Sequence, residues 1–336
     1  MKPSIAQTES RWPHRLAVVL VCATFPLIFA GSLVTTYNAG MAVPDWPSTY
    51  GYNLFLYPWQ TWLFGPWDLF IEHGHRLLGA LVGMLTIAFM LSVLLLDGRR
   101  WVKALSVLAL AAVIAQGLLG GARVLLDQRM LAMIHGCFGP AFFAFCVALA
   151  VFTSRRWRES SGVSAKGAGY VRFQRLSVIT LVLSFVQILL GAQLRHVPVD
   201  ASPSSFRALV VFHVVMAFVL LGHAAVLVFL ACMGHAGHWA VVFSTWLLAS
   251  FLVLQVGLGV GTWMVNYGWP DWDETFPFAA GYTIHAEGML QTNIVTAHVA
   301  LGSLILAAAA QLCARSLRLL RPAVDDQSAS VRLEAA

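Results

Sequence analysis

Four apolar segments of the chain each contain one histidine at a similar depth from the same predicted membrane face. These are His75, His135, His213 and His298, in the segments 71–95, 130–152, 206–231 and 289–312. An ionisable ring inside a bilayer is costly and therefore suggests a function. One ring on every second segment is typical of two pairs of axial ligands, and imidazole is a common axial ligand of haem iron. The pattern predicts haem bound between facing helices.

Other interpretations of these histidines are weaker. A single helical histidine is more often a hydrogen-bonded packing residue, but four in register favour ligation. Structural zinc usually has ligands at short local spacing, whereas these four histidines are scattered along the chain. His73 is two residues from His75 and should point to a different side of its helix. We expect His223 to be a hydrogen-bonded interior group.

The run Glu72-His73-Gly74-His75-Arg76 is the most specific local motif. Glu72 shares a helix face with His75, so a carboxylate is predicted beside the candidate iron ligand. At an apolar edge it could act as a catalytic acid or base. The alternative is a helix-terminal charge or an ion-pair partner of Arg76.

Three arginines at external helix ends are candidate cofactor-binding residues. Arg76, Arg123 and Arg195 could pair with haem propionates, because a guanidinium binds a carboxylate through two hydrogen bonds. The alternative is that they reach from the helix ends to the membrane interface.

The composition indicates an integral membrane protein. Of 336 residues, 59% are hydrophobic and 11% are charged. The apolar runs approach or exceed the ~20 residues that cross a bilayer. We predict an all-α polytopic protein with eight transmembrane helices, and no cleavable secretory signal. The predicted spans are 16–36, 72–96, 101–122, 130–153, 174–194, 206–231, 239–265 and 289–315.

Lysine and arginine predict the orientation of these spans. The two tails and the even-to-odd connections carry 16 of them, and the opposite face carries 4. The positive-inside rule therefore places both termini in the cytoplasm or its equivalent. The net charge of +6 is a topology signal, and no compact basic patch suggests nucleic acid.

The basic connection 154–175 divides the chain into halves of four spans, 1–160 and 161–336. An even number of spans per half predicts two four-helix bundles related by a pseudo-twofold axis along the membrane normal. Short repeats support this plan. A glutamine precedes a glycine by four residues in three odd spans, at 116/120, 187/191 and 255/259, and Pro-Asp-Trp occurs at 44–46 and 270–272.

The long external loops are rich in tryptophan and tyrosine. They could form an aromatic belt at the membrane interface or a lid over a cofactor pocket. The five cysteines lie in or beside apolar spans, and the absence of a CxxCH motif excludes a covalently attached c-type haem.

On these features the chain resembles the heme A synthase family. The resemblance rests on the eight-span plan, the Glu72-x-x-His75-Arg76 motif, the histidines at 135, 213 and 298, and Pro-Asp-Trp-Pro at 44–47. It covers residues 15–318. It implies an enzyme that oxidises the C8 methyl group of heme O to the formyl group of heme A, through two hydroxylations and loss of water.

The resemblance also implies roles for residues. His213 and His298 would hold a resident heme b, and His75 and His135 would embrace heme O as substrate, with Glu72 at the reacting edge. Implied partners are heme O synthase, cytochrome oxidase assembly factors and membrane lipid, in a bacterial plasma membrane or a mitochondrial inner membrane. Many members have a cysteine pair in the first external loop. This chain has none, which puts thiol-mediated electron input in doubt.

Two other functions compete. A di-haem b-type electron-transfer subunit, such as part of a quinol oxidoreductase, needs the same four histidines but no catalytic carboxylate. A transporter or haem-handling protein with structural histidines ranks last, because no span resembles the broken helix of a substrate-translocating protein.

Overall fold

The computed structural model describes residues 10–160, 163–165, 169–198, 200–268 and 288–322. Eight of its helices are long and apolar enough to cross a membrane, which confirms the predicted all-α membrane architecture. They are α1 (Trp12–Thr36), α3 (Trp67–Leu96), α4 (Arg100–Leu126), α5 (Arg129–Thr153), α7 (Gly169–Arg195), α8 (Pro203–Cys232), α9 (Trp239–Tyr267) and α10 (Met289–Leu319).

Two short helices and two short strands complete the described elements. These are α2 (Trp59–Phe64), α6 (Arg155–Glu159), and the parallel three-residue strands β1 (Val163–Ala165) and β2 (Leu320–Pro322). The Pro-Asp-Trp repeat at 270–272 and His285 lie outside the described residues.

Helix ends follow local chemistry. The Ser202 hydroxyl accepts a hydrogen bond from the Ser205 N–H at the start of α8, and Pro203 occupies its first turn, where no N–H is needed. α3 begins at Trp67, directly after Pro66 and five residues before the predicted start. His75 therefore lies about two turns into its helix, one turn deeper than predicted.

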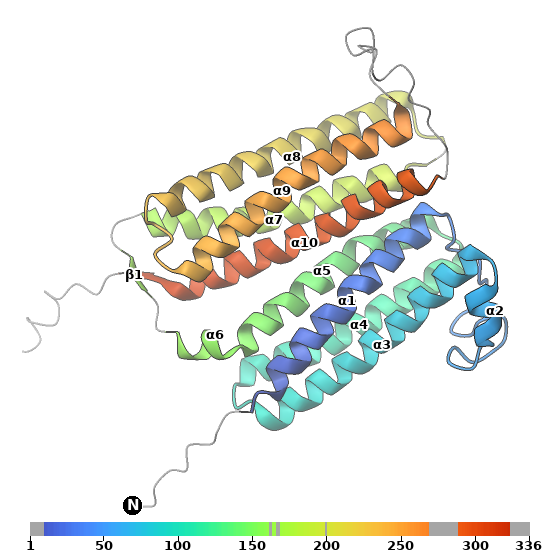
Figure 1. The fold of residues 1–336 in the computed structure, drawn as a ribbon, viewed down its shortest axis with the longest axis horizontal. Coiled ribbons are helices and arrows are strands. Elements are labelled where there is room, and N and C mark those ends of the chain that lie inside the picture. Colours follow the sequence, from blue (N-terminus) through green and yellow to red (C-terminus); the bar gives the residue numbers. More distant parts are fainter. Residues whose placement is uncertain (1–9, 161–162, 166–168, 199, 269–287, 323–336) are drawn as a thin grey trace, which may run out of the picture.

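The long helices form two rings of neighbours (Figure 1). In the first half α1 packs on α3, α3 on α4, α4 on α5, and α5 on α1; in the second half α7, α8, α9 and α10 repeat this order. α5 and α10 pack together at the seam between the rings. The order suits the predicted pseudo-twofold axis and the division at residue 160, which both stay predictions.

Each ring has its own apolar core. Leu20, Phe89 and Leu149 are fully buried in the first, and Phe173 and Leu227 in the second. A third cluster at the seam includes Phe143, Ala144, Leu306 and Ala307.

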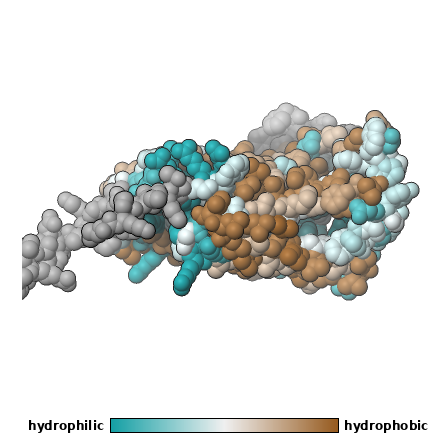
Figure 2. Space-filling model, turned by 90° about the horizontal axis from the view of Figure 1, so that it is seen from below, coloured by the Kyte–Doolittle hydropathy of each residue, from teal (hydrophilic) through white to brown (hydrophobic). Residues whose placement is uncertain are grey.

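The hydropathy of the surface changes along the direction of the helix axes. Figure 2 shows a continuous apolar band between two more hydrophilic ends. An apolar band of this kind on long helices is the surface that a lipid bilayer covers.

Candidate functional site

The structure brings the four predicted histidines together as two pairs. The ring centroids of His75 and His135 lie 6.3 Å apart with an interplanar angle of 90°. Those of His213 and His298 also lie 6.3 Å apart, at 60°. Each pair joins helices that are diagonal in their ring, α3 with α5 and α8 with α10, so each site is at the centre of a bundle.

The spacing of each pair suits one iron between the two rings. Metal–nitrogen bonds of ~2.0 Å, with each nitrogen ~1.15 Å from its ring centre, place two opposed imidazole centroids ~6.3 Å apart. Among the described residues, no three His, Cys, Asp or Glu side chains converge on one possible metal position. Two protein ligands per site suit a porphyrin, which supplies the other four nitrogens.

Each histidine rests on a glycine of the preceding long helix. A Cβ added at Gly31 of α1 would lie 2.8 Å from Cε1 of His75, and one at Gly120 of α4 would lie 3.1 Å from Cε1 of His135. The corresponding distances are 3.2 Å between Gly191 and His213, and 3.3 Å between Gly259 and His298. The glycines therefore allow each imidazole to approach a neighbouring backbone closely.

In the first half a backbone carbonyl orients each ring. Nδ1 of His75 lies 3.2 Å from the Leu27 carbonyl oxygen, and Nδ1 of His135 lies 3.2 Å from that of Gln116. Both carbonyls belong to the residue four positions before the supporting glycine. An Nδ1–H that donates to a carbonyl leaves the Nε2 lone pair available to a metal.

The second half has a different contact: the amide Nε2 of Gln187 lies 3.3 Å from Nε2 of His213, and that of Gln255 lies 3.4 Å from Nε2 of His298. Nε2 of Gln187 donates to the His213 carbonyl oxygen at 3.0 Å, and Nε2 of Gln255 donates to that of His298 at 2.9 Å. Nδ1 of both histidines is buried without a hydrogen-bond partner among the described residues. A buried ring nitrogen without a protein partner is an expected feature of a ligand position.

Glu72 is 1% exposed and both of its carboxylate oxygens have protein partners. Oε2 accepts the Val43 N–H at 2.9 Å, and Oε1 accepts from Arg76 Nη2 at 2.9 Å. Arg123 Nη2 lies 3.9 Å from Oε1. The predicted pairing of Glu72 with Arg76 is therefore present, and Glu72 also holds the first external loop.

The three candidate arginines differ in their remaining donors. Arg76 donates to the carbonyl oxygens of Asp45, Ser48 and Val43, at 2.7, 2.9 and 2.7 Å. It is therefore largely committed to the loop.

Arg195 of α7 reaches across to α1, where it donates to Ser32 O at 2.7 Å and Thr36 Oγ1 at 2.5 Å. Arg123 packs against Gly40, and within the described part of the chain its ion-pair contact is the longer one with Glu72. Of the three, Arg123 has the guanidinium least used by the protein.

The aromatic residues of the first external loop fall into an exposed group and an inward-packed one, and the lid over a cofactor pocket stays a prediction. Tyr52, Trp59 and Trp67 are 50%, 57% and 50% exposed, as expected for an interfacial belt. Trp46 instead packs onto Gly121 of α4, which is adjacent to the glycine beneath His135. The loop therefore contacts α4 at the residue that follows the supporting glycine of His135.

Two other histidine predictions are confirmed. His73 is buried, bonds to Thr49 Oγ1 at 3.0 Å and packs against Tyr57 and Trp62, on the loop side of α3. Nδ1 of His223 lies 3.3 Å from Thr180 Oγ1, which confirms the predicted hydrogen bond, although the side chain is half-buried and not fully interior.

Comparison with known proteins agrees with this geometry. Residues 66–202 match the COX15-CtaA family, described as cytochrome oxidase assembly protein. This region contains Glu72, His75 and His135. The chain is also 30% identical over 199 residues to the heme A synthase of Shouchella clausii (strain KSM-K16). Both matches support the heme A synthase family.

The resemblance to the heme A synthase family is thereby confirmed. The alignment with the Shouchella clausii relative covers 57% of this chain and 62% of the relative. The chain therefore spans about three fifths of that relative's length. The family match ends at residue 202, before His213 and His298.

Proposed function

We propose that the protein is a heme A synthase, a membrane oxidoreductase that converts the C8 methyl group of heme O to the formyl group of heme A. The observation that carries the proposal is the presence of two imidazole pairs with the same 6.3 Å spacing, each at the centre of a bundle. The name of the Shouchella clausii relative supports the reaction. One pair can hold a resident haem and the other a substrate haem.

The two pairs differ in a way that supports separate roles. Glu72, Arg76 and Arg123 lie around the first pair, in α3 and α4, and hold the external loop above it. The second pair has glutamine contacts, and the helices α7 to α10 around it contain no Asp or Glu. We therefore assign heme O to His75 and His135, and heme b to His213 and His298.

In this assignment the protein supplies ligation, orientation and a dry site. The resident heme b would transfer electrons, the chemistry that a bis-imidazole haem supplies. The carbonyls of Leu27 and Gln116 would fix the tautomer of the first two rings, which leaves Nε2 of each available to the haem iron. Trp46 packs on Gly121, next in sequence to the glycine beneath His135, and would help to exclude water.

Glu72 would act as the acid–base group near the reacting edge. Its carboxylate is buried between Arg76 and Arg123, so its contact with the Val43 N–H must open before it can exchange a proton with substrate. Loop movement and proton transfer are then coupled at one residue. Arg123 and Arg195, with Arg76 in a smaller role, would hold haem propionates at the same face.

The remaining assignments follow from the same proposal. Heme O and heme A are the bound partners, with heme O synthase and cytochrome oxidase assembly factors as protein partners. Both termini would face the cytoplasm of a bacterium whose plasma membrane holds the protein, or the equivalent side of a mitochondrial inner membrane.

Haem extraction from purified protein tests the function. We expect heme B together with heme O or heme A, identified by reversed-phase chromatography and mass spectrometry. Heme B alone, at two per chain, would instead identify a di-haem electron-transfer protein. The protein should be produced in cells that also make heme O, since substrate would otherwise be missing.

A further inference from the structure

A cavity opens on the opposite face, far along the helices from the external loop. Its volume is ≈ 370 Å³, and its lining residues are Arg99, Trp101, Trp157, Arg158 and Arg318. They come from the start of α4, from α6 and from the end of α10, so the cavity lies where the two halves meet. None of them belongs to the histidine sites.

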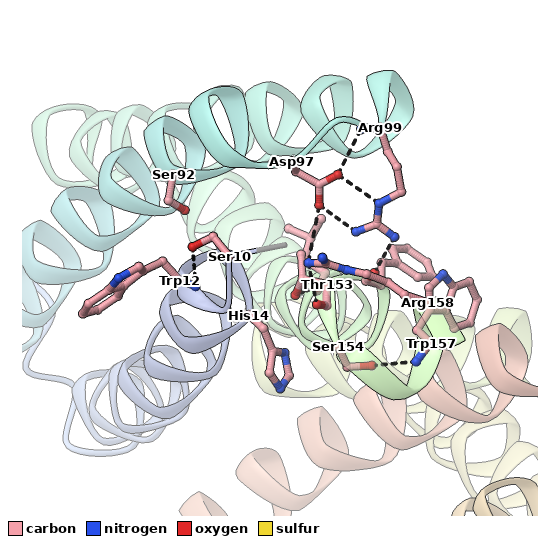
Figure 3. Close-up of polar contacts among 12 residues, drawn as sticks. Ser10, Trp12, His14, Ser92, Asp97, Arg99, Thr153, Ser154, Trp157 and Arg158 are labelled. Carbon is pink, nitrogen blue, oxygen red and sulfur yellow. Dashed lines mark hydrogen bonds and ion pairs between the residues drawn. The ribbon is translucent and has the colours of Figure 1, made fainter. Parts of the chain in front are cut away.

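One buried carboxylate organises the first-half side of this cavity (Figure 3). Asp97 is 4% exposed and binds Arg99 through two contacts, Oδ1 with Nε at 2.9 Å and Oδ2 with Nη2 at 2.7 Å. Arg158 Nη2 lies 3.8 Å from Oδ2. Burial alone would raise the pKa of Asp97. The hydrogen bonds and charge of Arg99 lower it by more than burial raises it, so the pKa is below its usual value.

The second-half side supplies a cation without a carboxylate. Arg318 has no acidic partner among the described residues, and its Nε is buried with no hydrogen-bond acceptor. The guanidinium lies 5.8 Å from the ring centroid of Trp157. Cation–π contact fixes the group but leaves its N–H donors available to a ligand.

Aromatic rings form the walls between these cations. Arg99 lies 5.3 Å from the centroid of Trp101, and Phe152 contacts both Trp101 and Trp157 with centroid distances of 5.3 and 4.9 Å. Tryptophan is enriched where lipid headgroups meet hydrocarbon. The two tryptophans in the lining therefore suit a site at the level of the lipid headgroups.

We propose that this cavity binds the phosphate of an anionic phospholipid. Guanidinium groups bind phosphate oxygens through paired hydrogen bonds, and basic pockets between helices on the positively charged face suit lipid phosphates. Leu95 and Leu317, which are close in sequence to Arg99 and Arg318, are 80% and 54% exposed and can contact acyl chains. The lipid would bridge α4 and α6 of one half to α10 of the other.

Native mass spectrometry of the detergent-purified full chain tests this proposal. Dioctanoyl phosphatidylglycerol should bind with a measurable Kd, and dioctanoyl phosphatidylcholine should bind at least about fivefold more weakly. Arg318→Gln should weaken phosphatidylglycerol binding about fivefold, the effect of one cation near a membrane surface. The matched control is Arg155→Gln on α6, whose exposed side chain pairs with Glu159 outside the cavity lining; its Kd should change less than twofold.

Trp157→Leu gives a second test if Arg318→Gln does not fold. It removes the ring that holds Arg318 and should weaken phosphatidylglycerol binding about threefold. A binding measurement with inorganic phosphate distinguishes a lipid headgroup from a free phosphate ion as the ligand. If it binds as tightly as the lipid and responds to the same variants, the site takes a free anion and the lipid assignment is wrong. Unchanged lipid affinity in the folded variants would also overturn the proposal.

Discussion

His75 lies so close to Gly31 that a Cβ at the glycine would be 2.8 Å from the imidazole Cε1. This is shorter than a normal van der Waals contact, so either ring or helix must move when a methyl group is added. The same relationship recurs at the other three histidines, at 3.1 to 3.3 Å. The glycines thus set the position of every candidate iron ligand.

Gly31→Ala should therefore displace His75 and lower heme A formation about ten- to hundredfold, the cost of a misplaced reactive group. The resident b-type spectrum should be unchanged, because His213 and His298 lie in the other half. Heme A and heme O are measured by extraction, and heme b by reduced-minus-oxidised absorbance. Gly83→Ala in α3 is the control, since its added Cβ meets nothing within 4 Å. Equal loss in both variants would contradict the supporting role of Gly31.

Variants of the two histidine pairs should have different effects on the b-type absorbance spectrum. His213→Ala or His298→Ala should abolish the low-spin b-type spectrum, because each removes one of two axial ligands. His75→Ala and His135→Ala should retain that spectrum and lose heme A formation. Purified variants are compared by absorbance and by haem content per chain. An unchanged spectrum in both second-half variants would refute the assignment of the resident haem.

Much of this site is predictable from sequence, because span number and histidine depth depend on local composition. The glutamine and glycine repeats also mark three of the four supporting glycines. Gly31 escapes that pattern, since Leu27 stands where the other odd spans have glutamine. The structure explains why this is tolerated: His75 uses the Leu27 backbone carbonyl, which any residue supplies.

Other features depend on contacts between distant parts of the chain. The Val43 N–H reaches Glu72 over 29 positions, and Arg195 reaches Ser32 over 163 positions. No local pattern encodes either contact. The motif at 72–76 therefore identifies a reactive carboxylate candidate without showing that it also holds a loop.

Topology can be tested with single cysteines. The predicted orientation places Ser160 in the cytoplasm and Gln60 outside. In a cysteine-free background, Ser160→Cys and Gln60→Cys should react with a membrane-impermeant maleimide from opposite sides of intact cells and inverted vesicles. Both positions lie outside the eight long helices, and Gln60 is exposed. Labelling of both from the same side would contradict the eight-span topology.

Glu72→Gln tests whether the carboxylate has a chemical role beyond holding the loop. Glutamine keeps the volume and can still accept the Val43 N–H, but it cannot exchange a proton as a carboxylate or balance the two arginines. We expect heme b to be retained and the ratio of heme A to heme O to fall at least about tenfold. A stability loss of ~1–3 kcal/mol is also expected, because a buried hydrogen-bonded charge is removed.

The control for loop loosening is Asp45→Ala. Asp45 accepts from Ser48 Oγ, Tyr50 N and Gly51 N, so its removal loosens the loop while leaving Glu72 intact. Hydrogen exchange of residues 42–52 measures the loosening in both variants, alongside the ratio of heme A to heme O. At equal loosening, only Glu72→Gln should lose heme A. If both variants lose product equally, Glu72 acts by positioning the loop, and the proton-transfer role must be withdrawn.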